Sequence, residues 1–210
     1  MMLPLLALLS APFVSEVHAQ DAAKTYDLRG SLYIQVYKDP TTVAQALAHD
    51  HVIQAAGWTG TVTWDPNNLA SCKVSMSLPV ASLVVDEKNM RTQLGYTTFP
   101  SDSEREDIKK AMLGSDQLDG AKFPTITYQS TSCTAVGEAV DVAGNLTIHG
   151  VTKPVTMHMA VKADTVNFSA KGSTAIRATQ YGFQPFSAGF GALKNQDRML
   201  LVVDVNGTPK

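Results

Sequence analysis

Two histidines separated by one residue form the most distinctive polar cluster of the chain. His49 and His51 flank Asp50, and in a strand the side chains of residues i and i+2 point to one face, a spacing that can serve a transition metal. A third ligand would have to come from His149 or His158. Because the sequence places neither of them beside the pair, we favour an exposed strand start with solvated histidines and expect no metal. A metal-binding protein or metal-dependent enzyme built on His49 and His51 stays open as an alternative.

The two cysteines of the chain are the other reactive side chains. Cys72 begins one predicted strand and Cys133 ends another that could lie antiparallel beside it, so a disulfide is topologically sensible in an oxidising compartment. Direct pairing would put Met76 on the face of Gln129 rather than on the face of Tyr128. A β-bulge would repair this mismatch. Both the bridge and two free thiols therefore stay open.

Enzymatic motifs are absent from the sequence. There is no Gly-x-Ser-x-Gly nucleophile turn, no phosphate-binding loop and no His-Glu-x-x-His zinc motif. The acidic run Asp102–Asp107 is typical of a helix N-terminus, where carboxylates interact favourably with the helix dipole. We therefore predict no catalytic residues, no cofactor and a non-enzymatic function.

Charge and composition exclude two further classes of protein. The chain has 17 Lys and Arg against 19 Asp and Glu, a formal net charge of −2, which argues against a basic nucleic-acid surface. Hydrophobic residues make up 44% of the chain and charged residues 17%, so it is not a highly charged disordered polymer. The apolar content suits a folded domain with its own core.

The first 19 residues have the pattern of an export signal. Met1–Val14 is an apolar run too short to span a bilayer, and Val17-His18-Ala19 places small residues before a cleavage point, although no Lys or Arg precedes the run. We predict a signal peptide over residues 1–19 and one mature domain over residues 20–210, in the bacterial periplasm or secreted. No later apolar stretch is long enough to cross a membrane, so we expect a soluble mature protein without a membrane span.

Short alternating segments dominate the mature chain. In Val155–Ala163, valine or methionine occupies every second position from Val155 to Val161, which is the pattern of a strand buried on one face. Such segments are Ser31–Tyr37, Val52–Trp64, Lys73–Val80, Thr125–Cys133, Val140–His149, Val155–Ala163, Asn167–Tyr181 and Met199–Val205. One helix is predicted over Ser101–Leu113, which begins with the capping-box spacing Ser101-x-x-Glu104. Half-buried strands of this kind are antiparallel and form either a barrel or a sandwich; the alternation alone does not decide between them.

The segment Asn145–Met157, NLTIHGVTKPVTM, resembles the characteristic hairpin of the YceI-like family. These are bacterial periplasmic, lipocalin-like proteins that bind polyisoprenoid lipids. Three weaker resemblances occur in the family's order: Leu118–Tyr128, Gln180–Gly182, and Ala192–Asp197 before the last strand. Together these segments cover most of Trp58–Asn206.

Two segments depart from the family pattern. Ala48–Ile53 stands where the family has a His-Ser opening, and Asp86–Gly114 is longer and more charged than the usual connection. Both lie where the headgroup of a ligand or a partner could be recognised, so the identity of the ligand depends on them.

The resemblance implies an eight-stranded antiparallel lipocalin-like barrel with one short helix packed across it. An isoprenoid lipid of the quinone or polyprenyl type would lie in the barrel with its headgroup at the mouth. Because its tail makes no hydrogen bonds, its pocket would be apolar. The inward faces of the predicted strands would line it with Trp58, Val62, Val74, Met76, Leu78, Ile126, Tyr128, Leu146, Ile148, Met157 and Met159. A barrel with a solid core that serves as a protein-interaction module is a further alternative, and a homodimer also stays open.

Overall fold

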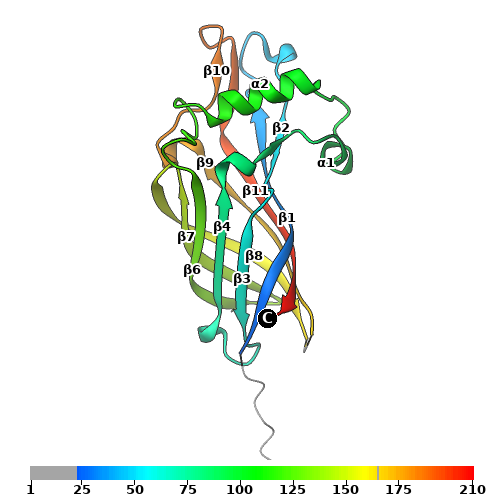
Figure 1. The fold of residues 1–210 in the computed structure, drawn as a ribbon, viewed down its shortest axis with the longest axis vertical. Coiled ribbons are helices and arrows are strands. Elements are labelled where there is room, and N and C mark those ends of the chain that lie inside the picture. Colours follow the sequence, from blue (N-terminus) through cyan, green and yellow to red (C-terminus); the bar gives the residue numbers. More distant parts are fainter. Residues whose placement is uncertain (1–22, 165) are drawn as a thin grey trace, which may run out of the picture.

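The polypeptide forms one antiparallel sheet that closes into a barrel (Figure 1). The computed structural model describes residues 23–164 and 166–210, so the predicted signal peptide at 1–19 lies outside the described residues. The barrel wall consists, in spatial order, of β1 (Lys24–Lys38), β3 (Thr59–Trp64), β4 (Lys73–Pro79), β6 (Thr125–Val136), β7 (Ala139–Ile148), β8 (Val151–Ala163), β9 (Phe168–Arg177) and β11 (Leu193–Pro209). β11 pairs with β9 on one side and with β1 on the other, which closes the barrel.

Closure distinguishes the barrel from a sandwich, because a sandwich would leave β1 and β11 as free edges. The predicted eight-stranded lipocalin-like barrel is therefore confirmed. Side chains alternate as expected: in β8, Met157 and Met159 are buried whereas Thr156 and His158 are exposed. One face of each strand thus points into the barrel.

The first strand is longer than predicted. The predicted segment Ser31–Tyr37 is only the second half of β1, which begins at Lys24. The chain passes through Gly30 with φ of 127°, a conformation that glycine adopts readily and other residues rarely do. Gly30 therefore lets the strand bend and include residues on its N-terminal side, at the point where the sequence suggested that the strand begins.

The predicted single strand over Val52–Trp64 is wrong, because the structure has two strands there. β2 (His51–Gln54) pairs with the C-terminal half of β1, and β3 pairs with its N-terminal half. Gly57, with φ of 64°, lies in the connection between them. The face that points into the barrel changes across this connection, from the odd position of Ile53 to the even position of Val62.

Short strands extend the sheet beyond one end of the barrel. β5 (Val84–Val85) pairs with β2, and β10 (Ser187–Ala188) pairs with the start of β11. Isolated 3-10 turns occur at Gln45–Leu47, Leu69–Ser71, Val80–Ser82 and Ala178–Tyr181.

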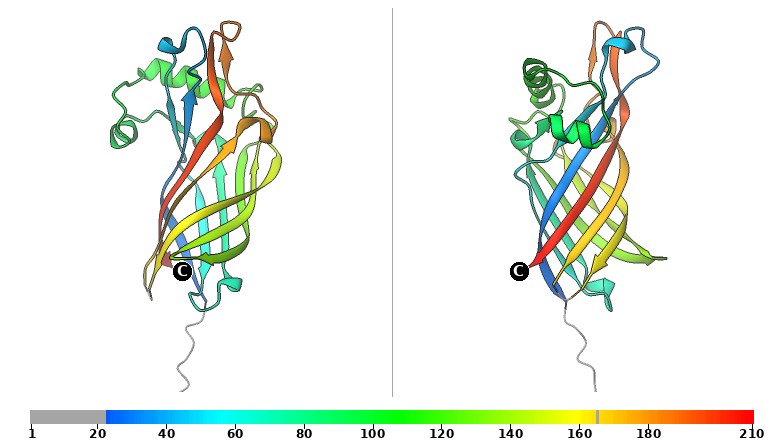
Figure 2. Two further views of the ribbon diagram at one scale, coloured as in Figure 1. Left: turned by 180° about the vertical axis from the view of Figure 1, so that it is seen from behind. Right: turned by 90° about the vertical axis from the view of Figure 1, so that its right-hand side faces the viewer.

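Two α-helices are found in the described residues, α1 (Lys88–Gln93) and α2 (Asp102–Leu113), both at the same end of the barrel (Figures 1 and 2). α2 is the predicted helix, and Ser101 and Glu104 form its capping box. α1 was not predicted from the sequence. Neither of these helices has the length and apolar character needed to cross a bilayer.

Candidate ligand-binding cavity

The interior of the barrel is not filled by its own side chains. It holds a cavity of about 240 Å³, lined by residues from all eight wall strands and by Met112 and Leu118 from the α2 region. All the residues predicted for the lining contribute to it: Trp58, Val62, Val74, Met76, Leu78, Ile126, Tyr128, Leu146, Ile148, Met157 and Met159. These residues therefore line the cavity, and that they bind a ligand stays a prediction.

The strand register explains why these side chains face one another. Met76 lies opposite Tyr128 in the β4–β6 pair, and Tyr128 lies opposite Leu146 in the β6–β7 pair. Directly opposed residues point to the same face of a sheet. This single register therefore places the apolar faces of three neighbouring strands on the interior.

Several inward-facing side chains are only partly buried. They are Val74, Met76, Ile126, Leu201 and Val203, which all pack against the core cluster and line the cavity. Protein interiors are normally close-packed, so side chains in a solid core would be fully covered. Their incomplete burial accords with an interior that is not solidly packed.

Polar groups on the lining are few. The Tyr128 hydroxyl donates to the carbonyl oxygen of Val142 at 3.1 Å, and burial raises the pKa of Tyr128 to about 12. Among the described residues, the indole N–H of Trp64 is the buried side-chain group without a hydrogen-bond partner, and the Trp64 ring stands edge-on to Phe168 at 5.8 Å between centroids. The cavity wall thus suits an apolar guest.

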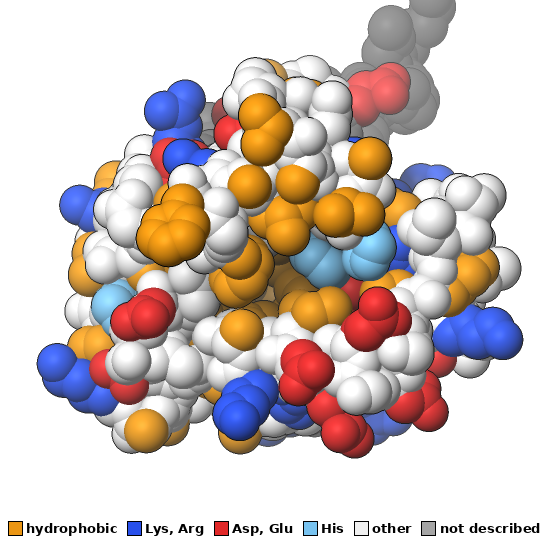
Figure 3. All heavy atoms as spheres, turned by 90° about the horizontal axis from the view of Figure 1, so that it is seen from above, with side chains coloured by type: hydrophobic (Ala, Val, Ile, Leu, Met, Phe, Trp, Pro, Cys, Tyr) orange, Lys and Arg blue, Asp and Glu red, His pale blue; other side chains and the backbone are white. Residues whose placement is uncertain are grey.

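α2 lies across one end of the barrel (Figure 2), and Met112 of this helix lines the cavity. Ile108, Met112 and Leu113 pack against the core, but no residue of this helix is fully buried. Seen from above, this end of the molecule is hollowed near its centre, with hydrophobic and histidine side chains around the hollow and acidic side chains along one side (Figure 3). We call this end the mouth.

A buried carboxylate, Asp86, organises the mouth. It follows β5 with φ of 48° and accepts hydrogen bonds from His51 Nδ1 at 2.7 Å, Val52 N–H at 2.8 Å and Arg91 Nη1 at 2.6 Å. Burial alone raises the pKa of the Asp86 carboxyl, but these hydrogen bonds together hold it below its usual value of 3.8. Asp86 is therefore an ionised acceptor in the folded protein.

Arg91 on α1 is the cation that compensates Asp86, and neither side chain has exposed surface. The Arg91 guanidinium also donates to the carbonyl oxygens of Thr98 and Asp50, and it lies 4.5 Å from the centre of the Tyr96 ring. These contacts fasten residues 86–98 to the start of β2. A charge with no exposure is stable only when it is paired and hydrogen-bonded in this way.

By its register His51 belongs to the face of β2 that points to the interior, although it is not itself part of the cavity lining. It lies opposite Val36, and Ile53 lies opposite Ile34 two pairs further along the strands; Val36, Ile34 and Ile53 all line the cavity. Because ionised Asp86 can only accept, Nδ1 of His51 carries the hydrogen. In the neutral ring Nε2 is then an acceptor, and no described residue occupies it.

The four histidines of the described residues do not assemble. The rings of His49 and His51 lie 6.3 Å apart, but His149 packs between Phe123 and Phe183, and His158 pairs with Asp141 on the outer surface. Within the described chain no three His, Cys, Asp or Glu side chains form a group that could hold a metal ion. His51 is instead engaged with Asp86.

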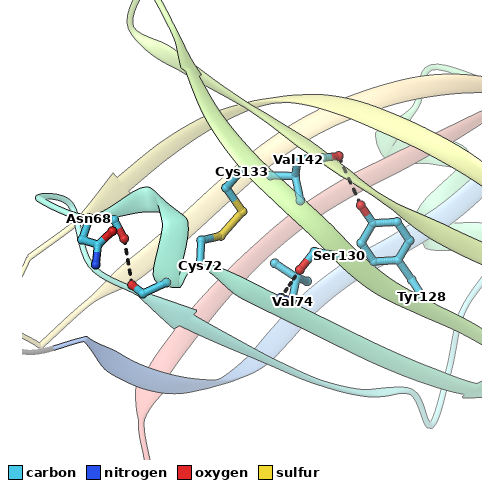
Figure 4. Close-up of a disulfide and its surroundings, with 8 residues drawn as sticks. Asn68, Cys72, Val74, Tyr128, Ser130, Cys133 and Val142 are labelled. Carbon is cyan, nitrogen blue, oxygen red and sulfur yellow. Dashed lines mark hydrogen bonds between the residues drawn. A yellow bond between two sulfur atoms is a disulfide. The ribbon is translucent and has the colours of Figure 1, made fainter.

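Cys72 and Cys133 form a disulfide between the starting end of β4 and the far end of β6 (Figure 4). The β6–β7 register shifts between Ser130 and Ser132, which is the bulge that the pairing requires. At the same place the hydroxyl of Ser130 accepts from the N–H of Val74 at 2.7 Å. Because of the bulge, Cys133 can pair with Cys72 while Tyr128 of the same strand still points into the barrel.

Sequence reasoning missed Asp86 and Arg91. The only available signal was the length and charge of the Asp86–Gly114 segment, which pointed to recognition at the mouth without naming these residues. They are five positions apart in the sequence, and Asp86 has a positive φ. No periodic sequence pattern predicts a buried ion pair of this kind.

Closed antiparallel barrels with an apolar cavity and a helix across one end define the lipocalin-like class. Within that class, the YceI-like domain model matches residues 35–206, so the chain belongs to the YceI-like family.

Curated relatives of the chain are similar over a limited segment. The chain is 38% identical over 79 residues to the UPF0312 protein PA0423 of Pseudomonas aeruginosa, and 33% identical over 98 residues to Protein YceI of Escherichia coli O157:H7. The matched segments cover 36% and 47% of this chain, and 41% and 42% of those relatives.

Solved structures share the fold at low sequence identity. Burkholderia cenocepacia BcnA superposes with a TM-score of 0.63 at 18% identity, covering 85% of this chain and 96% of that one. The Campylobacter jejuni YCEI protein gives a TM-score of 0.57 at 15% identity, covering 75% and 84%. At these identities the comparison establishes the fold alone.

Proposed function

We propose that the protein is a non-enzymatic carrier that holds an isoprenoid lipid of the quinone or polyprenyl type inside its barrel. The observation that supports this most is an apolar cavity left open along a barrel whose inward side chains could otherwise have filled it. The YceI-like family is known for lipid and isoprenoid ligands. The predicted signal peptide supports the periplasm as the place of action, in a bacterium.

The lining suits a branched, irregular tail. Met76, Met157, Met159 and Met199 all contribute to it, and the flexible methionine side chain adapts to guests of uneven shape. An isoprenoid tail forms no hydrogen bonds, and the cavity wall has few polar groups that would need one. A barrel that served only as a solid interaction module would have no need for the open interior.

Filling the cavity should displace the lipid. Val203 and Val202 are neighbours on β11, but Val203 lines the cavity and Val202 does not. Val203→Phe should weaken binding of an isoprenoid quinone about tenfold, because the added ring occupies the space of the tail. Both tryptophans of the chain, Trp58 and Trp64, line the cavity, so quenching of their fluorescence by the quinone measures binding.

Val202→Phe is the matched control and should bind the quinone as the wild type does. Unaltered binding by Val203→Phe, with both variants folded, would refute the placement of the lipid in the barrel. Failure of the wild type to bind either a quinone or a polyprenol would refute the proposed function itself.

We place the headgroup at the mouth, next to His51. Nε2 of His51 has no hydrogen-bond partner among the described residues, and a hydroxyl headgroup can either donate to it or accept from it, so the wild type should prefer a polyprenol over squalene, an isoprenoid hydrocarbon without a hydroxyl. His51→Phe should lower polyprenol affinity about fivefold, since one hydrogen bond contributes on the order of 1 kcal/mol, and should leave squalene affinity unchanged. His158→Phe is the control, because His158 lies on the outer surface. An equal loss for both lipids would contradict the headgroup contact.

A further inference from the structure

Two loops stand side by side beyond the mouth. We call residues 40–48 and 184–193 the mouth loops. The N–H of Ala44 donates to the carbonyl oxygen of Ala192 at 3.1 Å, and the N–H of Asp39 donates to that of Lys194 at 2.8 Å. Figures 1 and 2 both show these loops as the outermost parts of the end that carries α2. They therefore form one tip rather than two independent projections.

The mouth loops carry no charged residue. Neither segment contains Asp, Glu, Lys or Arg, although 17 basic and 19 acidic residues make up 17% of the chain. At that average, the 19 residues of the two segments would hold about three charges. Loops that face water normally carry polar and charged side chains, so this composition indicates a different environment.

Large apolar side chains are exposed on the same loops. Phe190 is fully exposed, Val43 is 92% exposed and Leu47 is 72% exposed, and Phe186 is exposed at the base of the second loop. Single exposed apolar residues are ordinary, but a group of them at one place marks an interaction surface. By contrast, Val136 and Val166 are exposed one at a time, on the β6–β7 and β8–β9 turns at the other end of the barrel.

We propose that the mouth loops dock the protein on a lipid bilayer, with Val43, Leu47, Phe186 and Phe190 in the interfacial layer. This inference rests on the proposed function for its purpose: an isoprenoid tail cannot cross water unprotected, so the mouth of its carrier must meet the membrane. The tip lies at the end of the barrel whose surface is hollowed among hydrophobic side chains (Figure 3), and Phe183, which directly precedes the second mouth loop, lines the cavity; this position supports a bilayer over a protein partner. Uncharged loops with exposed aromatic and aliphatic side chains match the chemistry of the membrane interface.

The charges near the tip predict which bilayer it prefers. Lys38, Asp39 and Lys194 lie at the base of the mouth loops, so this base carries charges of both signs, and the Lys38 ammonium donates to the carbonyl oxygen of Gln45. The first turns of α2 are acidic and exposed on the same end of the molecule. Docking should therefore depend on apolar insertion, should occur on zwitterionic lipid and should survive raised salt.

Flotation with phosphatidylcholine vesicles tests the proposal. The full-length mature protein should float with the vesicles, and the fraction bound should persist at high salt. The double variant Leu47→Asp/Phe190→Asp should bind at least about tenfold more weakly, because two apolar anchors are replaced by charges. Val136→Asp is the matched control, since it places the same charge on an exposed valine at the far end of the barrel, and it should bind as the wild type does.

Three results would overturn the proposal. The first is equal flotation of the double variant and the wild type. The second is binding that requires anionic phosphatidylglycerol and disappears at high salt. The third is a wild type that sediments as a dimer while the double variant sediments as a monomer. Quinone binding by fluorescence is measured on the same samples. A double variant that keeps its quinone affinity but loses flotation separates docking from cargo binding, and a wild type that floats but binds no isoprenoid contradicts only the proposed function.

Discussion

Replacing Asp86 by Asn should lower the free energy of unfolding by about 3–5 kcal/mol, the cost of leaving a buried charge without its partner. The Arg91 guanidinium has no exposed surface and cannot move to water without unfolding residues 86–98. The variant also loses the ionised acceptor that His51 and the Val52 N–H share. Urea unfolding followed by circular dichroism measures the change.

The pH dependence should identify the carboxylate as the cause. The pKa of Asp86 is lower in the folded protein than its usual value of 3.8, so ionised Asp86 contributes its full stability above that value. The contribution is lost as pH falls through the folded pKa. The difference in stability between the wild type and Asp86→Asn should therefore be constant near neutral pH and shrink in acid.

Asp141→Asn is the matched control for this experiment. Asp141 also accepts from a histidine, His158, at 2.7 Å, but both side chains are substantially exposed. Exposed pairs contribute at most about 1 kcal/mol, so this variant should unfold almost as the wild type does. Equal effects of the two substitutions would contradict the role of Asp86 as the anchor of the mouth.

Reducing the Cys72–Cys133 disulfide should cost about 2–4 kcal/mol of stability. The bridge closes a loop across a sequence separation of 61 residues, and such a link stabilises the fold mainly by restricting the unfolded chain. It joins β4 to β6, which are neighbours in the barrel but are separated in sequence by both helices. The urea midpoint of the wild type should fall when a reductant is added.

The double variant Cys72→Ala/Cys133→Ala provides the control. It should unfold near the midpoint of the reduced wild type and should not respond to the reductant. A wild-type midpoint that is the same with and without reductant would contradict a stabilising bridge.

The alternating strands were predictable because each one is a local pattern. In β8 the alternation of Met157 and Met159 with polar neighbours is enough to assign the strand and its inward face. The bulge in β6 was predictable only on the condition that the disulfide forms, since a bridged Cys133 and an inward Tyr128 cannot both be satisfied without it. The inward faces of the strands follow from this alternation, whereas the cavity between them was implied by the resemblance to the YceI-like family, and Trp58 lies just before β3 rather than within a strand.

The features that were missed depend on contacts that no local pattern encodes. Val52 reads as part of one long strand with Val62, but the chain reverses its inward face between β2 and β3. Asp86 and Arg91 read as ordinary surface charges, and only the fold shows that both are buried and paired. The mouth loops are visible in the sequence as uncharged runs, yet only their pairing across Ala44 and Ala192 makes them one surface.

Mass spectrometry of the organic extract from the purified protein tests the central claim most directly. The proposed carrier should release an isoprenoid lipid, close to one molecule per barrel, from the wild type and from Val202→Phe. Val203→Phe should release far less. An extract without isoprenoid, or an equal amount from Val203→Phe, would contradict the account of the barrel as the container of this lipid.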